Sequence, residues 1–238
     1  MQFPDPLVRA RFIRREKRFL VHVRLSDGSE TIAHTNNTGR MTGCLWPDAP
    51  VWLSPARNPA RKLRWTLELV ELPPGDGALV GVNTALANVV VGEALAAGRI
   101  PSLAEYRSTA SEVRYGQRNS RVDFLLTDGP DPELHTWLEV KNVSLVEAGL
   151  GRFPDAPSER GRKHLRELMD VVAAGQRAAL VFCVQRDDAR GVGPADSIDP
   201  DYGHLLREAA SVGVELHGLQ ATVTTQGIWP GPLLPVRL

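Results

Sequence analysis

Two carboxylates and one amine stand at a spacing that can act on phosphate esters. Asp123 lies in the segment Arg-Val-Asp-Phe-Leu-Leu, and Glu139 and Lys141 lie in Trp-Leu-Glu-Val-Lys. Carboxylate oxygens are the ligands that Mg²⁺ and Mn²⁺ prefer, and such an ion activates water and neutralises a phosphodiester. The sequence therefore predicts a metal site at Asp123 and Glu139. The carbonyl oxygen of Val140 is a third candidate ligand.

Both segments alternate polar and apolar residues, which predicts two strands. The Gly-Pro-Asp-Pro run at residues 129–132 separates them and predicts a hairpin connection. Side chains of a strand alternate between faces, so Glu139 and Lys141 project to the same side. A suitable register would bring Asp123 beside them. The alternative is that these three residues only form the solvent-exposed face of a sheet, without a chemical role.

Two roles near this cluster stay open. Lys141 would act either as a base or as a cationic stabiliser of developing charge, and we favour the stabiliser. Glu112, on the strand before the hairpin, is either an additional ligand or partner in the site or an ordinary surface glutamate.

The order Asp, then Glu-x-Lys on adjacent strands resembles the signature of the PD-(D/E)xK nuclease superfamily, with Val122 in place of the signature proline. Three further segments carry a wider resemblance: residues 36–44 (NNTGRMTGC), 111–116 (SEVRYG) and 153–169, which begin FPDA and continue with SERGRKHLRELM. Together they resemble the sugar fermentation stimulation protein A family of bacteria and archaea over essentially the whole chain. The resemblance implies an N-terminal OB-like barrel, a nuclease-like domain and DNA binding.

The composition is that of an ordinary globular protein with a formal net charge of zero. DNA binders usually carry a basic surface, so a DNA site here must come from local charge asymmetry. Cys44 and Cys183 are far apart in the sequence and are expected to be reduced thiols in a cytoplasm. No apolar run approaches the ~20 residues needed to span a bilayer, and no secretory leader opens the chain, so we expect a cytoplasmic protein without membrane contact.

Residues 1–76 are expected to form the barrel. Alternating basic and apolar residues predict one long or bent strand over residues 3–25, followed by a turn at 26–29 and a returning strand at 31–34. Further strands are expected at 51–53 and 63–72. Several short strands within about seventy residues fit a small barrel better than a sandwich.

Three groups of residues are candidates for nucleic-acid binding. The first two groups lie in the barrel. Aromatic side chains alternate there with basic residues and suit stacking on bases, although aromatic residues on strands more often belong to the hydrophobic core. Its loop at residues 36–43 is either a tight turn that bonds its own backbone or a phosphate contact. The third lies on a predicted helix after the hairpin, whose basic face would hold the nucleic-acid backbone. The residues are Arg14, Lys17, Arg18, Phe19, Lys62 and Arg64; Asn37, Thr38 and Arg40; and Arg160, Lys163 and His164.

A Pro-Pro-Gly-Asp-Gly run at residues 73–77 predicts the domain boundary, so the nuclease-like domain would span 77–238. A helix is expected to begin at Asn83 and Thr84 and to end at Gly98, with Leu86, Val89, Val90 and Leu95 on one side. Strands near 112–115, 121–126 and 137–141, a helix at 158–174, a strand at 179–184, a helix at 202–212 and a strand at 214–223 follow. This mixed α/β order matches the restriction-endonuclease-like αβββαβ core. The proline-containing tail from Trp229 cannot be helical and is expected to pack over a surface.

Two functions compete. One is a Mg²⁺- or Mn²⁺-dependent nuclease in which the barrel delivers single-stranded or branched DNA to Asp123, Glu139 and Lys141. The other is a non-catalytic DNA-binding regulator of sugar metabolism genes with a vestigial site. An RNA-processing factor would use the same parts, and the sequence leaves the oligomeric state open, a homodimer included.

Overall fold

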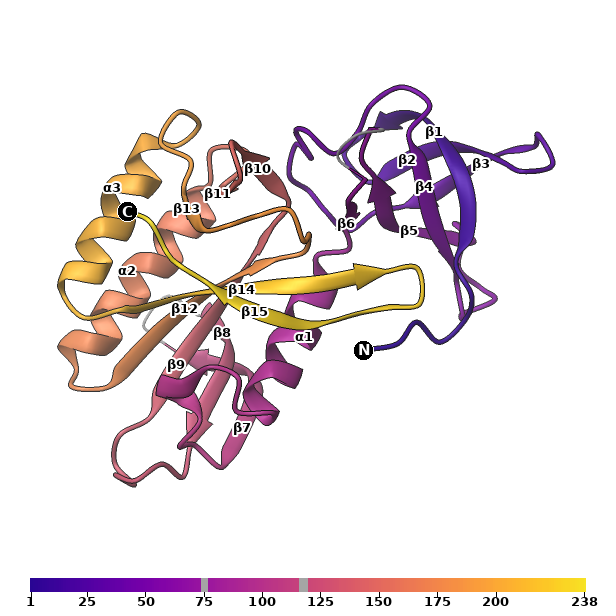
Figure 1. The fold of residues 1–238 in the computed structure, drawn as a ribbon. Coiled ribbons are helices and arrows are strands. Elements are labelled where there is room, and N and C mark those ends of the chain that lie inside the picture. The colour runs from indigo at the N-terminus through magenta and orange to yellow at the C-terminus, as the bar shows by residue number, and fades with distance from the viewer. Residues whose placement is uncertain (74–76, 116–119) are drawn as a thin grey trace.

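A computed structural model describes residues 1–73, 77–115 and 120–238. The chain forms a barrel of strands at the N-terminal end and a larger sheet flanked by helices (Figure 1). No helix within the described ranges is long and apolar enough to cross a membrane.

The first sheet closes on itself as an OB-like barrel. It is built from β1 (Val8–Glu16), β2 (Leu20–Leu25), β3 (Glu30–His34), β4 (Pro50–Pro55) and β5 (Trp65–Glu71). The order β3-β2-β1-β4-β5 is completed by a parallel pairing between β3 and β5. Closure removes the free sheet edges, and the interior is filled by alternating apolar residues such as Val21, Val23, Leu53 and Leu67. The predicted barrel is therefore confirmed.

The prediction of one long strand over residues 3–25 is wrong. β1 and β2 are two antiparallel strands joined by a tight turn, in which Lys17 and Arg18 both have positive φ, 48° and 65°. Two successive residues in this region are typical of the hairpin turns that match strand twist, and Asn or Gly usually supplies them. Because this turn uses basic residues instead, the sequence carried no turn signal. The next turn, with Gly28 at φ 85°, was predicted correctly.

The predicted linker at residues 73–77 lies partly outside the described residues, which omit 74–76. Beyond it, β6 (Leu79–Gly81) pairs antiparallel with β5 and extends the first sheet by one strand. The barrel and the second domain are thus joined by a strand that belongs to the first sheet.

The second domain is a six-stranded mixed sheet of order β15-β14-β12-β9-β8-β7. Its strands are β7 (Ser108–Tyr115), β8 (Ser120–Thr127), β9 (Thr136–Val143), β12 (Arg177–Val184), β14 (Glu215–Thr224) and β15 (Gly227–Leu234). The helices are α1 (Ala85–Ala96), the short η1 (Pro101–Leu103), α2 (Glu159–Ala173) and α3 (Pro200–Ser211). This order confirms the predicted αβββαβ core. A small sheet of β10 (Leu145–Glu147), β11 (Leu150–Phe153) and β13 (Val192–Pro194) was not predicted, because its strands are short and two contain glycine.

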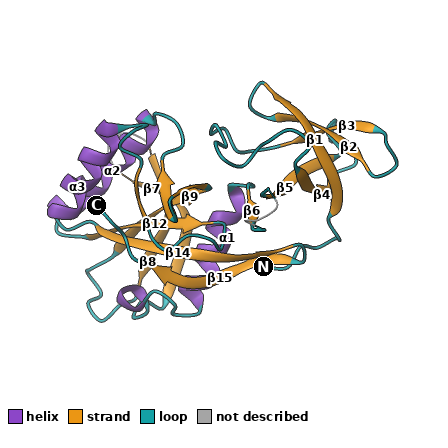
Figure 2. Ribbon diagram, turned by 45° about the horizontal axis from the view of Figure 1, so that its top comes forward, coloured by secondary structure: helices purple, strands orange, loops and turns teal. Residues whose placement is uncertain are grey.

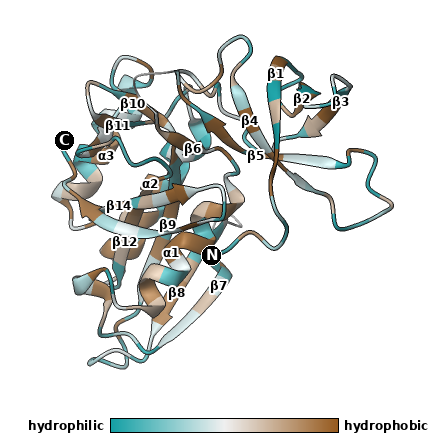
Figure 3. Cartoon of the chain, turned by 45° about the vertical axis from the view of Figure 1, so that its right-hand side comes forward, coloured by the Kyte–Doolittle hydropathy of each residue, from teal (hydrophilic) through white to brown (hydrophobic). Residues whose placement is uncertain are grey.

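Helices cover both faces of the large sheet (Figure 2). Along β12, Ala179, Val181 and Cys183 pack toward α1, whereas Leu180 and Phe182 pack toward α2 and α3. Strands buried on both faces read as continuous apolar runs, which is why this strand was recognisable. At the edge, β7 is mostly exposed and polar, and Figure 3 shows its contrast with the apolar β8.

The predicted face of α1 is wrong at one residue. Val90 is buried and Leu86 and Leu95 pack against the core, whereas Val89 is 41% exposed. Asn88 and Glu93 are the two strongly polar residues of the helix, so apolar periodicity gave little contrast between its faces.

The tail from Trp229 is a strand and not only a covering segment. β15 pairs antiparallel with β14, with a register irregularity between Leu219 and Ala221. Pro230 and Pro232 are tolerated because β15 is an edge strand, where a missing N–H on the outer side removes no sheet bond. The bridge between Gln2 and Gly227 and the bond from the Phe3 N–H to the Gln226 carbonyl (2.8 Å) add residues 2–3 beside this strand.

The two faces of α1 give a matched test of the packing. Val90→Ala removes two methyl groups from a fully buried site and should destabilise the protein by about 2 kcal/mol. Val89→Ala removes the same atoms from an exposed site and should be neutral or slightly stabilising, because Ala is the better helix former. Denaturant unfolding of both variants measures the difference. Equal losses would contradict this orientation of α1.

Candidate functional site

The predicted hairpin of β8 and β9 holds the cluster. Its antiparallel pairing runs from Leu126 opposite Thr136 to Phe124 opposite Leu138 and then stops. At that point the Asp123 carboxylate takes the place of a backbone partner and accepts the Val140 N–H at 2.7 Å. Its other oxygen accepts the Asn88 amide of α1 at 2.7 Å. Asp123 is thus fixed where the two strands cease to pair.

Glu139 and Lys141 lie on the same face of β9, as predicted. Lys141 Nζ is 2.6 Å from Glu139 Oε1, and both side chains are buried. The ring of His164, on α2, also bonds Glu139 Oε1 through Nδ1 and lies 3.2 Å from Lys141 Nζ. The structure therefore brings together Asp123, Glu139 and Lys141, and adds His164.

The orientation of His164 follows from its partners. A carboxylate only accepts, so Nδ1 carries the proton in its bond to Glu139. Nε2 is then free to accept from Arg160 Nε, which is 3.4 Å away on the same helix. His164 was predicted as part of a basic helix face that holds the nucleic-acid backbone. The structure adds a contact that was not predicted: the buried ring bonds Glu139. His164 also lines the open cleft, so its role in binding stays a prediction.

The two carboxylates have opposite electrostatic surroundings. Burial disfavours ionisation of Glu139, but the charge of Lys141 and the hydrogen bonds from Lys141 and His164 outweigh it and hold the pKa of Glu139 below its usual value. Burial, and then the neighbouring Glu139 charge, raise the pKa of Asp123 against the bonds from Val140 and Asn88 and the charge of Lys141. The cluster thus pairs one carboxylate whose pKa is lowered with one whose pKa is raised.

The donor atoms fit a divalent cation. Glu139 Oε2 is fully buried and has no hydrogen-bond partner in the described part of the chain. A buried carboxylate oxygen without a partner is costly, and a cation would satisfy it. The described residues contain no group of three His, Cys, Asp or Glu side chains able to hold a metal. Any ion would therefore rest on two carboxylates, a backbone carbonyl and water, which is a set that Mg²⁺ accepts.

A cleft of about 600 Å³ opens beside the cluster. It is lined by Glu112, Arg121, Asp123, Glu159, Arg160, Lys163 and His164. In the pairing of β7 with β8, Ser111 lies opposite Phe124 and Val113 opposite Val122. Glu112 therefore lies opposite Asp123, and it has a positive φ of 56°. This exposed carboxylate and the basic residues of α2 are thus on the rim of the same cleft.

The barrel candidates are distributed around the β1–β2 turn and two loops. Arg14 is exposed and 2.9 Å from Glu16, Lys17 and Arg18 form the turn, and Phe19 is 45% exposed. Four more exposed candidates lie on the loops before β4 and β5. They are Thr38, Arg40, Lys62 and Arg64.

The Asn37 side chain bonds the backbone of its own loop, and Asn37 also lines a hollow described below, so its role in binding stays a prediction. It is 5% exposed, and its Oδ1 accepts the Gly39 N–H at 2.9 Å. Arg15, which the sequence analysis passed over, donates to the carbonyl of Asn37 at 2.5 Å and to that of Gly39 at 2.9 Å. The alternative of a loop that bonds its own backbone therefore describes Asn37.

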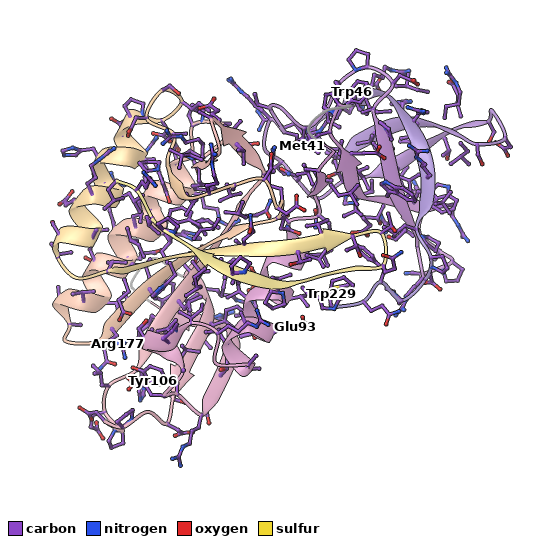
Figure 4. All side chains as sticks on the ribbon, viewed as in Figure 1. Met41, Trp46, Glu93, Tyr106, Arg177 and Trp229 are labelled. Carbon is purple, nitrogen blue, oxygen red and sulfur yellow. The ribbon has the colours of Figure 1, made fainter. Side chains whose placement is uncertain are left out.

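The loop at residues 36–43 also touches the second domain. The Asp155 carboxylate accepts the Met41 N–H at 2.9 Å, and Met41 lies where the barrel meets the second domain (Figure 4). Between the domains runs a hollow of about 320 Å³, here named the interdomain groove. Its lining is Arg18, residues 36–39, Thr84, residues 140–142, Ser144 and residues 152–158. Lys141 thus contacts the cluster on one side and this groove on the other.

Sequence reasoning missed three residues that shape the cluster. Asn88 and Tyr115 gave no signal, because an Asn on an apolar helix and a Tyr at a strand end are common. Burial, together with the carboxylates of Glu139, Glu167 and Asp123, raises the pKa of Tyr115, so its phenol stays protonated. Glu167 is buried on the same helix as His164, three residues further on, and this helical spacing is the one signal that was available.

A closed OB-like barrel followed by a mixed sheet that carries Asp and Glu-x-Lys on adjacent strands defines a two-part protein of the OB and restriction-endonuclease-like folds. Residues 13–82 match the model described as "SfsA N-terminal OB domain", and residues 85–227 match "Sugar fermentation stimulation protein RE domain". The chain belongs to the sugar fermentation stimulation protein family, which confirms the resemblance.

Known proteins are similar over the full length. The sugar fermentation stimulation protein homologs of Teredinibacter turnerae and Geobacter metallireducens are 51% and 48% identical, each over all of both chains. A solved structure described as Pyrococcus furiosus SfsA in complex with Ca²⁺ is 28% identical, with a TM-score of 0.88, and the match covers 100% of this chain and 98% of that one.

The raised pKa of Asp123 predicts a stability effect. Asp123→Asn removes the half-buried charge, and Asn88 can turn its amide over to accept from the new N–H₂ group. Without metal, the variant should melt at a higher temperature than the wild type at neutral pH. The difference should vanish as the pH falls toward the ordinary Asp value of about 3.9, because Asp123 is then protonated in both the folded and the unfolded chain. Thermal melts in EDTA across this range measure it, and a lower melting temperature for the variant at neutral pH would contradict the assignment.

Proposed function

We propose that this protein is a nuclease that uses Mg²⁺ or Mn²⁺ to cleave phosphodiesters of a nucleic acid held between the barrel and the cleft. The observation that carries the proposal is the partnerless, fully buried Glu139 Oε2 beside a half-buried Asp123, which lines the cleft and whose pKa is raised. Such an arrangement destabilises the protein on its own, and a bound cation would relieve it.

Asp123, Glu139 and the Val140 carbonyl would hold the ion. In an extended strand the N–H and C=O of one residue point to the same side. Since the Val140 N–H points to Asp123, the Val140 carbonyl would lie on the same side of β9 as Asp123. The ion would supply a Lewis acid that activates water and neutralises the phosphate. The relative described in complex with Ca²⁺ supports a divalent site, because Ca²⁺ and Mg²⁺ both take oxygen ligands.

The cations around the carboxylates have separable roles. Lys141 is held at 2.6 Å by Glu139, so its ammonium is fixed beside the reaction site and would stabilise charge that develops there. His164 orients Glu139 through Nδ1. Arg160 and Lys163 line the open cleft and would hold phosphates of the bound strand.

The partner that fits this charge distribution is DNA, with RNA as the second polyanion to test. Net charge is zero, but Arg14, Lys17 and Arg18 gather on one barrel turn, and Arg160 and Lys163 gather on the cleft. Local clusters of this kind bind the phosphate backbone without sequence preference.

A non-catalytic DNA-binding regulator is the second candidate. It is favoured by the names of the relatives, which record stimulation of sugar fermentation, and by the ion pair through which Lys141 already engages Glu139. In that protein the cluster would be a vestigial structural core.

Metal binding should stabilise the fold. At a hundredfold excess over its dissociation constant, Mn²⁺ or Mg²⁺ should add about 2.7 kcal/mol. Glu139→Gln, which keeps the shape and loses the ligand charge, should abolish most of this increment. Thermal melts with and without metal measure it. A wild-type melting temperature that does not change across millimolar Mn²⁺ would remove the basis for the metal site.

A substitution of Lys141 distinguishes the two proposed functions, the nuclease and the non-catalytic regulator. Lys141→Met keeps the alkyl chain and removes the charge, so it should reduce the cleavage rate by ~10² or more with DNA affinity nearly unchanged. The matched variant Lys163→Met should mainly weaken binding, because Lys163 lines the cleft and not the buried cluster. Cleavage of labelled single-stranded, duplex and branched DNA and RNA in Mn²⁺ gives both quantities.

The outcome that rejects catalysis is equally defined. If the wild type, Lys141→Met and Glu139→Gln all cleave at one rate, the activity is a contaminant. If none of the three proteins cleaves any substrate, the nuclease proposal is rejected in favour of the non-catalytic DNA-binding regulator.

A further inference from the structure

We propose that the interdomain groove binds one unpaired nucleotide of the substrate strand next to Lys141, so that the protein selects single strands over duplexes. This inference rests on the proposed function for its substrate, a nucleic acid. It adds where an unpaired nucleotide is bound and how the fold would exclude a duplex there.

The groove begins where the cluster ends. Pairing between β8 and β9 stops at Leu138, so the β8 side of β9 is open from Val140 onward among the described residues, apart from the bond to Asp123. Val140, Lys141 and Asn142 all line the groove. A strand that crosses Lys141 therefore continues along this open edge into the space under the barrel.

One wall presents a hydrogen-bond donor in a fixed orientation. Gln185 is fully buried, and its Nε2 donates to the Asn142 Oδ1 at 2.5 Å and to the Asn83 carbonyl at 3.2 Å. The amide of Asn142 is thereby held with its oxygen turned to Gln185. Its Nδ2 has no protein partner within the described ranges and remains available to a ligand in the groove.

The opposite wall is the barrel loop, and it is also rigid. Asn36 donates to Asn83 Oδ1 at 2.6 Å and accepts the Thr84 N–H at 3.0 Å. Arg15 and Asp155 fix the rest of the loop through its backbone, which leaves the exposed Thr38 side chain on the lining. A site whose walls are fixed before binding loses little conformational entropy when a ligand enters.

The charges suit a phosphate. Arg18, Lys141 and Arg152 line the groove together with the carboxylate of Asp155. Lys141 is paired with Glu139 at 2.6 Å, so Arg18 and Arg152 are the lining cations that a phosphate would meet first. The Asp155 carboxylate is already engaged by the Met41 N–H. The groove thus carries an excess of cations together with short amide and hydroxyl groups, which is the combination that a nucleotide requires.

The size of the groove excludes a duplex. A volume of about 320 Å³ is at the lower end of the roughly 300–1,000 Å³ of small-ligand sites, and protein lies on both sides of it. A duplex carries a second strand and would meet the barrel loop, whereas an unpaired nucleotide can enter.

The test measures binding in EDTA, where no metal-dependent cleavage occurs. Short labelled single strands of DNA and of RNA, and a blunt DNA duplex, are titrated at fixed salt. We expect at least one of the single strands to bind at least about tenfold more tightly than the duplex. Asn142→Asp keeps the oxygen that Gln185 needs and replaces the donor by a charge, so single-strand affinity should fall by about tenfold or more. Thr38→Trp, on an exposed residue, should block the groove with a similar loss.

Gln226→Glu places the same charge change on the exposed β14–β15 turn and should leave single-strand affinity unchanged. The DNA and RNA arms identify which sugar is accepted. The inference is overturned if the duplex binds as tightly as both single strands, if no single strand binds, or if both groove variants keep wild-type affinity. If single strands are preferred but no cleavage occurs in Mn²⁺, the inference about the groove is supported and the nuclease proposal is rejected.

Discussion

The desolvation of two neighbouring carboxylates is the constraint around which the second domain is built. Glu139 is 3% exposed, and Lys141 and His164 both reach its Oε1 from different elements. Lys141 comes from the same strand, but His164 depends on the position of α2. That helix is in turn fixed by its Ser158 cap and by Asp199, which bonds the Ser158 N–H and Arg162. A small displacement of α2 would remove the His164 hydrogen bond from the buried Glu139 charge.

Asp123 is tied to the fold in a different way. Its hydrogen-bond donors are an N–H group of β9 and an amide of α1, so it joins the helix on one sheet face to the hairpin through neutral groups. These donors and the charge of Lys141 offset only part of the burial penalty, and the pKa of Asp123 stays raised. The two carboxylates therefore differ in how readily they ionise, an asymmetry common at functional sites.

The sequence predicted those features that depend on local patterning. The hairpin of β8 and β9, the run of β12 and the amphipathic α2 each have a period or a turn signal, and each was predicted. The turn at Lys17 and Arg18 has neither, and Val89 was placed on the packing face of α1 because that helix has few polar residues to mark its exposed side. His164 could not be assigned to the cluster, since its contact with Glu139 depends on how α2 sits on the sheet. The bond between Asn37 and Gly39 likewise depends on the conformation of the loop, which Arg15 holds through its backbone.

The first residues of the chain affect how the two parts can move. The Phe3 N–H bonds the Gln226 carbonyl and the Phe3 side chain is buried among residues of the second domain, although β1 of the barrel starts only five residues later. The barrel is therefore attached to the second domain both before β1 and after β6. A body held at two ends cannot swing open about a single hinge. Any widening between the parts would have to be a small rocking motion, or it would first have to peel residues 2–3 away from β15.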